Sequence, residues 1–250
     1  MIRSLILAVR FLTIVPVPGR QSDGPGAFGR AAWWFPIVGF ALGTFLVAMD
    51  RAVQALFSPI LSALLVLSVW KVATGGIHLD GLADCLDGLG GRDPQHRLAI
   101  MRDSRIGTFG AIGLILYFLI ALFALAEIPT GTRGRVLLLA PTVGRLAPLV
   151  IGPRWSAASP DHGSGAAFLG SVSQWAGPTH LVFVSVLSVW LLGRWGPVVA
   201  LGSLVAVSVW SAFLVHRFGG LTGDVLGSGI ELGELGILLA GAVLAPRGLV

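Results

Sequence analysis

The stretch IGTFGAIGLILYFLIALFALA, residues 106–126, contains no charged side chain and is bounded by Arg105 and Glu127. A helix needs about 20 consecutive apolar residues to cross the hydrocarbon core of a bilayer. The sequence therefore predicts a membrane-spanning helix over residues 106–126.

The whole chain shares the character of this stretch. Of its 250 residues, 55% are hydrophobic and only 12% are charged, and the mean hydropathy is +0.87. An average soluble domain has about 25% charged residues, so this chain has too little polar surface to cover a soluble core. We therefore expect an all-α, polytopic integral membrane protein, with residues 1–250 forming one membrane-embedded domain.

Uncharged runs elsewhere in the chain raise the expected number of spanning helices to about seven. The expected spans are residues 31–49, 52–70, 106–126, 136–153, 175–193, 195–215 and 235–249. Asp50 and Arg51 alone separate the first two runs, and Arg194 alone separates the fifth from the sixth, so each pair predicts a tight hairpin. Arg145 interrupts the fourth run and should face protein or water, because a charged side chain in lipid is costly.

The basic residues indicate which side of the membrane each loop occupies. With seven spans, eleven lysine or arginine residues fall on the side of the N-terminus and five on the other side. Because positive charge is enriched in cytoplasmic loops, we expect the N-terminal side to face the cytoplasm of a bacterial-type inner membrane. The basic residues are scattered singly between apolar runs, so the net charge of +5 does not indicate a nucleic-acid partner.

Acidic residues are rare and unevenly placed. Eight of the 12 lie in two polar segments, 71–105 and 216–234, that both fall on the expected cytoplasmic side. They are Asp80, Asp84, Asp87, Asp93, Asp103, Asp224, Glu231 and Glu234. We therefore expect a polar catalytic face at the cytoplasmic side of the membrane.

The first segment contains HLDGLADCLDG, residues 78–88. Asp80, Asp84 and Asp87 are spaced so that they share one face of a helix, where three carboxylates repel one another. A bound cation removes this repulsion, and ligands that are all oxygen favour Mg²⁺, Mn²⁺ or Ca²⁺. We expect all three acids to bind Mg²⁺, with His78 orienting a carboxylate or contacting phosphate. The alternative is a solvated acidic helix face.

The second segment contains GGLTGDVLGSGIELGEL, residues 219–235. Its glycines predict a broken helix lining a cavity, with backbone amides close to a phosphate or metal. Asp224 is expected to join the metal ligands, and Glu231 and Glu234 are candidates for further ligands or for supporting them. The alternative is a loop at a helix end whose acids are merely exposed.

Between these segments, MRDSRIGTFG carries a third group of candidates. Arg102, Ser104 and Arg105 are candidates for binding phosphate, because guanidinium groups match phosphate oxygens in geometry and charge. Arginines at the end of a span are also ordinary membrane anchors, which is the alternative. Asp103 is expected either to hold one of the arginines or to join the metal ligands.

Carboxylates that hold a metal beside arginines are suited to displacement at phosphorus. The metal neutralises a diphosphate and its leaving group, and a carboxylate accepts the proton of the attacking hydroxyl. In this interpretation Asp84, Asp87 and Asp224 are the catalytic residues.

Three motifs of the chain resemble the signature segments of the cobalamin synthase family, also called adenosylcobinamide-GDP ribazoletransferase. They are TGGIHLDGLADCLDGLGG, IMRDSRIGTFGAIGL and GGLTGDVLGSGIELGEL. The N-terminal FLTIVPVPGR and the later FPIVGFALG are similar to the opening of that family. The resemblance covers residues 11–240.

The resemblance implies the substrates, which the residues alone do not indicate. In that family, a ribose hydroxyl of α-ribazole or its 5′-phosphate attacks the diphosphate of adenosylcobinamide-GDP in a Mg²⁺-dependent reaction. GMP leaves, and the nucleotide loop of the cobamide is closed. The expected partners are therefore these small molecules and the lipid bilayer.

Two other functions remain open at this point. The spacing of Asp80, Asp84 and Asp87 is similar to that of the CDP-alcohol phosphotransferases, which use lipid acceptors, but the rest of their pattern is absent. An ion-coupled transporter is expected to carry acids at the membrane midplane. Here the acids are predicted at one face, with only Arg145 inside a span, which counts against transport.

Overall fold

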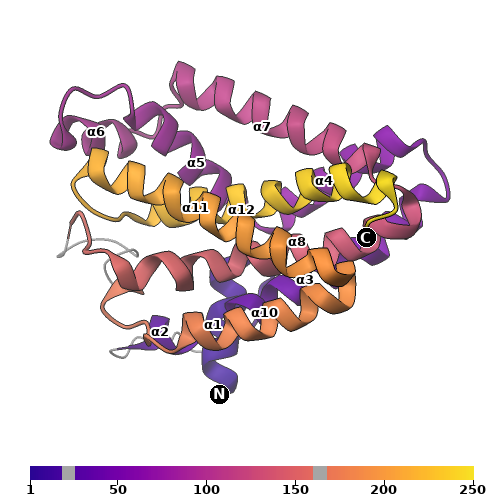
Figure 1. Ribbon diagram of the computed structural model, residues 1–250. Coiled ribbons are helices and arrows are strands. Elements are labelled where there is room, and N and C mark those ends of the chain that lie inside the picture. The colour runs from indigo at the N-terminus through magenta and orange to yellow at the C-terminus, as the bar shows by residue number, and fades with distance from the viewer. Residues whose placement is uncertain (19–25, 160–167) are drawn as a thin grey trace.

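The computed structural model describes residues 1–18, 26–159 and 168–250 (Figure 1). Within these ranges the chain is helical, and no strand is longer than one isolated bridge, between Ala157 and Leu221. The helices are α1 (Ile2–Leu12), α2 (Ala27–Ala32), α3 (Phe35–Gln54), α4 (Pro59–Ala73), α5 (Ile77–Gly88), α6 (Pro94–Met101), α7 (Thr108–Glu127), α8 (Thr130–Ile151), α10 (Ala176–Leu192), α11 (Gly196–Phe218) and α12 (Gly223–Leu244). The all-α prediction is confirmed.

Several of these helices are long and apolar enough to cross a membrane. Among the described residues there are five such stretches, or six if α4 and α5 cross together as a bent pair. One of the five, Ala176–Phe218, contains both α10 and α11, which pack against each other. The membrane class is thus confirmed, whereas the number of seven spans stays a prediction. Large apolar side chains on α7, such as Ile115 and Phe123, face outward as lipid contact requires.

The predicted turn at Asp50 and Arg51 is wrong, because α3 continues to Gln54. Asp50 is buried, its Oδ1 lies 3.4 Å from Arg133 Nη1, and its Oδ2 accepts a hydrogen bond from Gln54. Arg133, which falls in the loop between the expected spans 106–126 and 136–153, is itself buried in α8. Because a cation meets the carboxylate inside the protein, the helix does not have to end where the charge occurs.

The broken helix predicted at 219–229 is only partly correct, because the break is confined to residues 219–222, between α11 and α12. α12 begins at Gly223, where Thr222 Oγ1 accepts a hydrogen bond from Val225 N at 3.2 Å, and it continues without interruption to Leu244. Its glycines serve helix packing instead: a Cβ on Gly233 would lie 3.4 Å from the Cα of Gly144 in α8. The expected span 235–249 therefore begins too late in the sequence. The apolar helix already starts at Gly223, before Asp224, Glu231 and Glu234.

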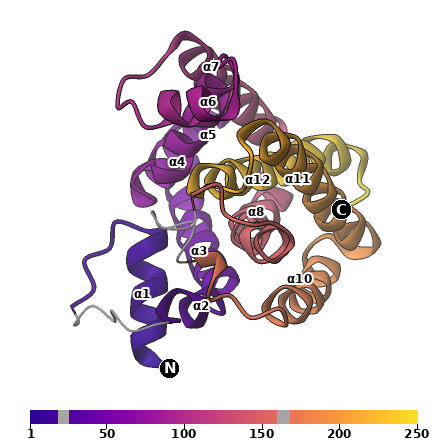
Figure 2. The same cartoon turned by 90° about the vertical axis from the view of Figure 1, so that its left-hand side faces the viewer.

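α8 forms the centre of the molecule (Figure 2). It packs against α3, α10, α11 and α12 and is buried over most of its length. Arg145, in the middle of α8, is only 1% exposed. The expectation that this arginine faces protein is confirmed.

α5 carries the first group of acids and lies at 90° to α4. The chain turns at Gly75 (φ +66°) and Gly76 (φ +68°), a left-handed conformation that favours glycine. α5 then packs against α7 and α12. A Cβ on Gly81 would lie 2.9 Å from the Cα of Asp224, so only glycine allows the two acid-bearing helices to approach this closely.

Candidate active site

Most of the predicted phosphate ligands and two of the predicted metal ligands line one hollow. This polar recess encloses about 430 Å³ between α5 and the segment that leads into α7. Its polar lining residues are Asp80, Asp84, Arg102, Asp103, Ser104 and Arg105. The structure thus brings together two sequence motifs that the chain separates by about one helix.

Two acids of the recess, Asp80 and Asp84, lie near Asp224 and, unlike Asp103, have no matching cation among the described residues. In the described part of the chain, no ion pair joins Asp80, Asp84 or Asp224 to a basic side chain. Asp84 lies within electrostatic range of Asp80, Asp87 and Asp224. Mutually repelling carboxylates of this kind are suited to a cation brought from solution.

The geometry fits Mg²⁺ better than a metal enclosed by protein. Among the described residues, no three His, Cys, Asp or Glu side chains converge closely enough to hold a metal ion. Mg²⁺ usually binds through one or two carboxylates and takes its other ligands from water and substrate phosphates. Asp80 and Asp84 on the wall of a 430 Å³ recess match that requirement.

Asp87 has a different position from the other two acids of α5. Its Oδ2 accepts a hydrogen bond from Gly107 N at 2.7 Å, and its Oδ1 accepts one from Gly110 N at 2.8 Å. The carboxylate therefore caps the N-terminus of α7, where the helix dipole favours negative charge. These bonds count against the predicted role of Asp87 as metal ligand and catalytic group, because both oxygens already bind the backbone.

The arginines of the recess are held by neighbouring side chains. Arg105 donates from Nε to both oxygens of Asp103, at 3.0 and 3.1 Å. These hydrogen bonds lower the pKa of the Asp103 carboxyl to about 2. Arg102 donates from Nη2 to Ser159 Oγ at 3.0 Å. Of the two roles expected for Asp103, the structure shows the first, because the carboxylate holds an arginine.

His78 lies outside the polar recess. It lines a separate cavity of about 110 Å³, the aromatic pocket, whose lining also includes Phe11, Phe35, Phe168 and Asp224. The side chain is 4% exposed. This position does not support the predicted contact with phosphate.

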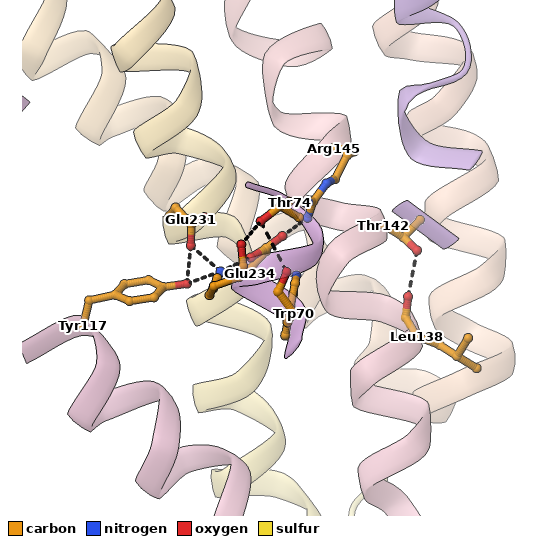
Figure 3. A network of polar contacts seen from close by, with 9 residues as sticks. Trp70, Thr74, Tyr117, Leu138, Thr142, Arg145, Glu231 and Glu234 are labelled. Carbon is orange, nitrogen blue, oxygen red and sulfur yellow. Dashed lines mark hydrogen bonds and ion pairs between the residues drawn. The ribbon is translucent and has the colours of Figure 1, made fainter. Parts of the chain in front are cut away.

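Glu231 and Glu234 are interior residues, which corrects their predicted place on the cytoplasmic face. Because α12 is continuous, they lie roughly 10 and 15 Å along the helix axis from Asp224. They belong to a buried ion cluster (Figure 3) formed by Lys71, Tyr117, Arg145, Glu231 and Glu234. Lys71 Nζ lies 2.5 Å from Glu231 Oε2 and 2.7 Å from Glu234 Oε2, and Arg145 pairs with the other oxygen of Glu234.

Sequence reasoning missed Lys71 and Tyr117 as members of this cluster. Lys71 Nζ donates to Tyr117 Oη at 2.9 Å, and Tyr117 Oη donates to Glu231 Oε2 at 2.5 Å. A signal was present, because the chain contains a single lysine and a single tyrosine. Lys71 is the first residue of the polar segment 71–105, which the sequence places on the cytoplasmic side, whereas the structure places its side chain in the interior.

Comparison with known proteins agrees with the motifs that line the recess. Residues 4–242 match the family described as cobalamin-5-phosphate synthase. A protein of Chlorobaculum tepidum is 35% identical over 252 residues, covering 97% of this chain and 96% of the relative. One of Laribacter hongkongensis is 38% identical over 248 residues, covering 98% of each. Both are named adenosylcobinamide-GDP ribazoletransferase.

A third relative with the same name, from Brevibacillus brevis, is 34% identical over 238 residues and covers 93% of this chain and 94% of its own length. No solved structure matches the chain. The matches include α5, α7 and α12, which carry the acids and shape the recess, together with the helices that support them. A relationship of this identity over nearly the whole length shows that the chain belongs to the cobalamin-5-phosphate synthase family.

Proposed function

We propose that this cobalamin-biosynthetic transferase moves the adenosylcobinamide phosphate group from adenosylcobinamide-GDP to a hydroxyl of α-ribazole or α-ribazole 5′-phosphate. The observation that carries the proposal is the polar recess, where unpaired carboxylates and two arginines share one hollow. The names of the relatives support the choice of donor and acceptor. A diphosphate requires both a divalent cation and guanidinium groups, and the recess offers residues for each.

In the proposed reaction, the acceptor hydroxyl oxygen attacks the phosphorus that bears the cobinamide. A new P–O bond forms, the bond from that phosphorus to the bridging oxygen breaks, and GMP leaves with the electron pair. Mg²⁺ held by Asp80 and Asp84 would supply charge neutralisation for the diphosphate. Arg102 and Arg105 bind its outer oxygens.

The hydroxyl proton needs an acceptor close to the metal ligands. Asp224 meets this need for two reasons. It packs against Gly81, a residue of α5 that lies between Asp80 and Asp84 in the sequence. Among the described residues, no cation forms an ion pair with it. Its backbone is fixed at the start of α12. We assign Asp224 as the general base.

We also propose that the recess faces the cytoplasm of an inner membrane. The excess of basic residues on that side supports this orientation, and nucleotide substrates are made in the cytoplasm. The transporter alternative gains two interior acids, Glu231 and Glu234, but each is matched by a cation in the buried ion cluster. An exchangeable ion would find no free carboxylate there.

The direct test incubates the purified protein in detergent with adenosylcobinamide-GDP, α-ribazole and Mg²⁺, and measures GMP by chromatography. GMP release is expected to require the acceptor, to stop with a chelator and to return with excess Mg²⁺. A diacylglycerol offered as acceptor tests the lipid alternative. Absence of GMP with α-ribazole, or faster release with the lipid, would overturn the proposal.

A further inference from the structure

The aromatic pocket has a lining unlike that of the polar recess. Phe35 stacks on Phe11 with ring centroids 5.7 Å apart and an interplanar angle of 12°, and on Phe168 at 5.8 Å and 19°. The three rings come from α1, α3 and the segment before α10, and they form one apolar column beside α12. Such a wall is suited to a flat, uncharged ring.

His78 is the polar feature that needs an explanation in this pocket. The side chain is 4% exposed, and neither ring nitrogen has a hydrogen-bond partner within the described residues. Buried polar groups in native proteins are nearly always paired, so an unpaired one calls for a missing partner. His78 is among the residues that line this cavity, so a ligand in the pocket is the candidate for the missing partner.

The pocket and the recess lie on different faces of α5, and Asp224 of the pocket packs against Gly81, next to Asp80 of the recess. Consecutive helix residues are about 100° apart, so His78 and Asp80 point in nearly opposite directions. Asp224 lines the pocket, and it also lies within electrostatic range of Asp80 and Asp84. A ligand held in the pocket therefore has one end beside the residues that act on the diphosphate.

We propose that the aromatic pocket binds the base of the acceptor nucleoside, with His78 donating a hydrogen bond to a ring nitrogen of that base. The inference rests on the proposed function and adds the site of acceptor recognition. The dimethylbenzimidazole of α-ribazole is flat and uncharged, and it has one ring nitrogen free to accept such a bond. Its ribose then lies toward Asp224, where the attacking hydroxyl must be.

The size of the pocket separates this base from the other reactant. A cavity of roughly 150 Å³ holds one benzene ring, so a partly enclosed cavity of about 110 Å³ admits the edge of a small bicyclic ring. A corrin ring is far too large to enter. Guanine carries several polar groups on its edge, whereas this lining is mostly phenylalanine, proline and aliphatic side chains.

The test compares two acceptors that differ in one atom: α-ribazole, and the matching dimethylindole nucleoside, in which the free ring nitrogen is a C–H group. Acceptor affinity is measured by equilibrium binding without adenosylcobinamide-GDP. The wild-type protein is expected to prefer α-ribazole by roughly tenfold, because the analogue leaves His78 unpaired. His78→Phe keeps the shape but removes the donor, so it should bind both nucleosides alike, and His78→Gln should recover part of the preference.

Gly227→Ala provides a second variant that tests the pocket through its size. Gly227 lines the pocket, and a Cβ there would lie 3.4 Å from His78 Cα, an ordinary contact, so the protein should fold. We expect it to weaken binding of the dimethylated base several-fold more than that of unsubstituted benzimidazole riboside.

These results are independent of the reaction itself. If His78→Phe keeps the wild-type preference for nitrogen, or if the variants weaken GMP binding instead of α-ribazole binding, the pocket does not hold the acceptor base. That inference would then fail even with GMP release intact. Conversely, a preserved preference with no GMP release would overturn the proposed function and leave a nucleoside-binding pocket.

Discussion

The polar recess and the buried ion cluster use the same residue types in opposite ways. In the cluster, the carboxylates of Glu231 and Glu234 from α12 (Figure 3) meet two cations, Lys71 from α4 and Arg145 from α8. All four side chains are at most 6% exposed. In the recess, Asp80 and Asp84 have no described cation as partner. The charges of the cluster therefore cancel, whereas the recess keeps negative charge that can bind a cation.

The difference teaches how a chain with only 12 acids divides them between structure and chemistry. Removing charges from water costs several kcal/mol per ion, which only close pairing offsets. The cluster meets that condition and joins α4, α7, α8 and α12 in the interior. Carboxylates left unpaired near the surface tolerate repulsion because an external cation can bind them. Variants in the recess should therefore lower the rate of GMP release, whereas variants in the cluster should lower stability.

Asp84→Asn is expected to have the largest effect on catalysis. The substitution keeps the shape of the side chain but removes a negative charge from the metal site, so GMP release should fall by orders of magnitude. Asp93→Asn is the matched control: Asp93 caps α6 through His96 N at 2.9 Å, and asparagine caps equally well. Activity of Asp84→Asn within a few-fold of the wild type would remove Asp84 from the metal site.

Asp224→Asn should also cause a large loss, and its combination with Asp84→Asn tests whether the two helices share one site. Residues that act as a unit are non-additive, so the double variant should be little worse than the more damaging single variant. Rates of GMP release at saturating Mg²⁺ give the three free-energy losses. Losses that add fully would indicate two separate sites.

Lys71→Met should damage stability more than chemistry. It leaves Glu231 and Glu234 with one cation between them, and breaking a buried ion pair costs about 3–5 kcal/mol. Adding Glu231→Gln restores the charge balance and should recover part of the melting temperature in detergent. The folded fraction should release GMP at a rate within a few-fold of the wild type. A stable but inactive Lys71→Met protein would mean that the cluster takes part in the reaction.

Asp87→Asn separates the two roles considered for this residue. As a cap, asparagine replaces one acceptor oxygen by an amide donor, so the loss should be about 1 kcal/mol of stability with a raised KM for adenosylcobinamide-GDP. Urea or thermal unfolding and steady-state kinetics measure both quantities. A loss of kcat as large as that of Asp84→Asn would restore Asp87 to the metal site.

The last prediction concerns orientation, and a labelling experiment tests which side of the membrane the recess faces. In a Cys85→Ala background, a cysteine at Arg217 should resist a membrane-impermeant thiol reagent in intact cells and react after permeabilisation. A cysteine at the exposed Arg194 should react in intact cells. The reverse pattern would place the recess on the outer side, away from the nucleotide pool.

Much of the fold follows from composition, because lipid imposes it locally. The run 106–126 became α7, Thr108–Glu127, with boundaries shifted by one or two residues. Turns were less predictable: charge at Asp50 suggested a helix end, but a partner 83 residues away in the sequence, Arg133, keeps that charge inside. Glycines 227 and 229 suggested a break in the helix, but α12 is continuous there and neighbouring helices pack closely against these glycines.

The sequence predicted those parts of the site that depend on residue type and spacing. It did not predict the roles that depend on contacts with distant segments of the chain. The motifs placed Asp80, Asp84, Arg102 and Arg105 among the candidates, and all four line one recess. Spacing could not distinguish Asp87, since its separate role depends on where α7 begins. Likewise, the partners of Glu231 and Glu234 lie more than 80 residues away along the chain.

The hydrogen bonds of Asp87 have a consequence for how quickly ligands leave. They fasten the start of α7 to α5, so the intervening segment, which contains α6 followed by Arg102, Ser104 and Arg105, forms a closed loop of chain whose ends are already joined. The entropy of closing such a loop is lost during folding, before any nucleotide arrives. Binding then restricts only the guanidinium side chains, and less of the binding free energy is spent on ordering. A protein arranged in this way should hold its donor for a long residence time, until an acceptor binds.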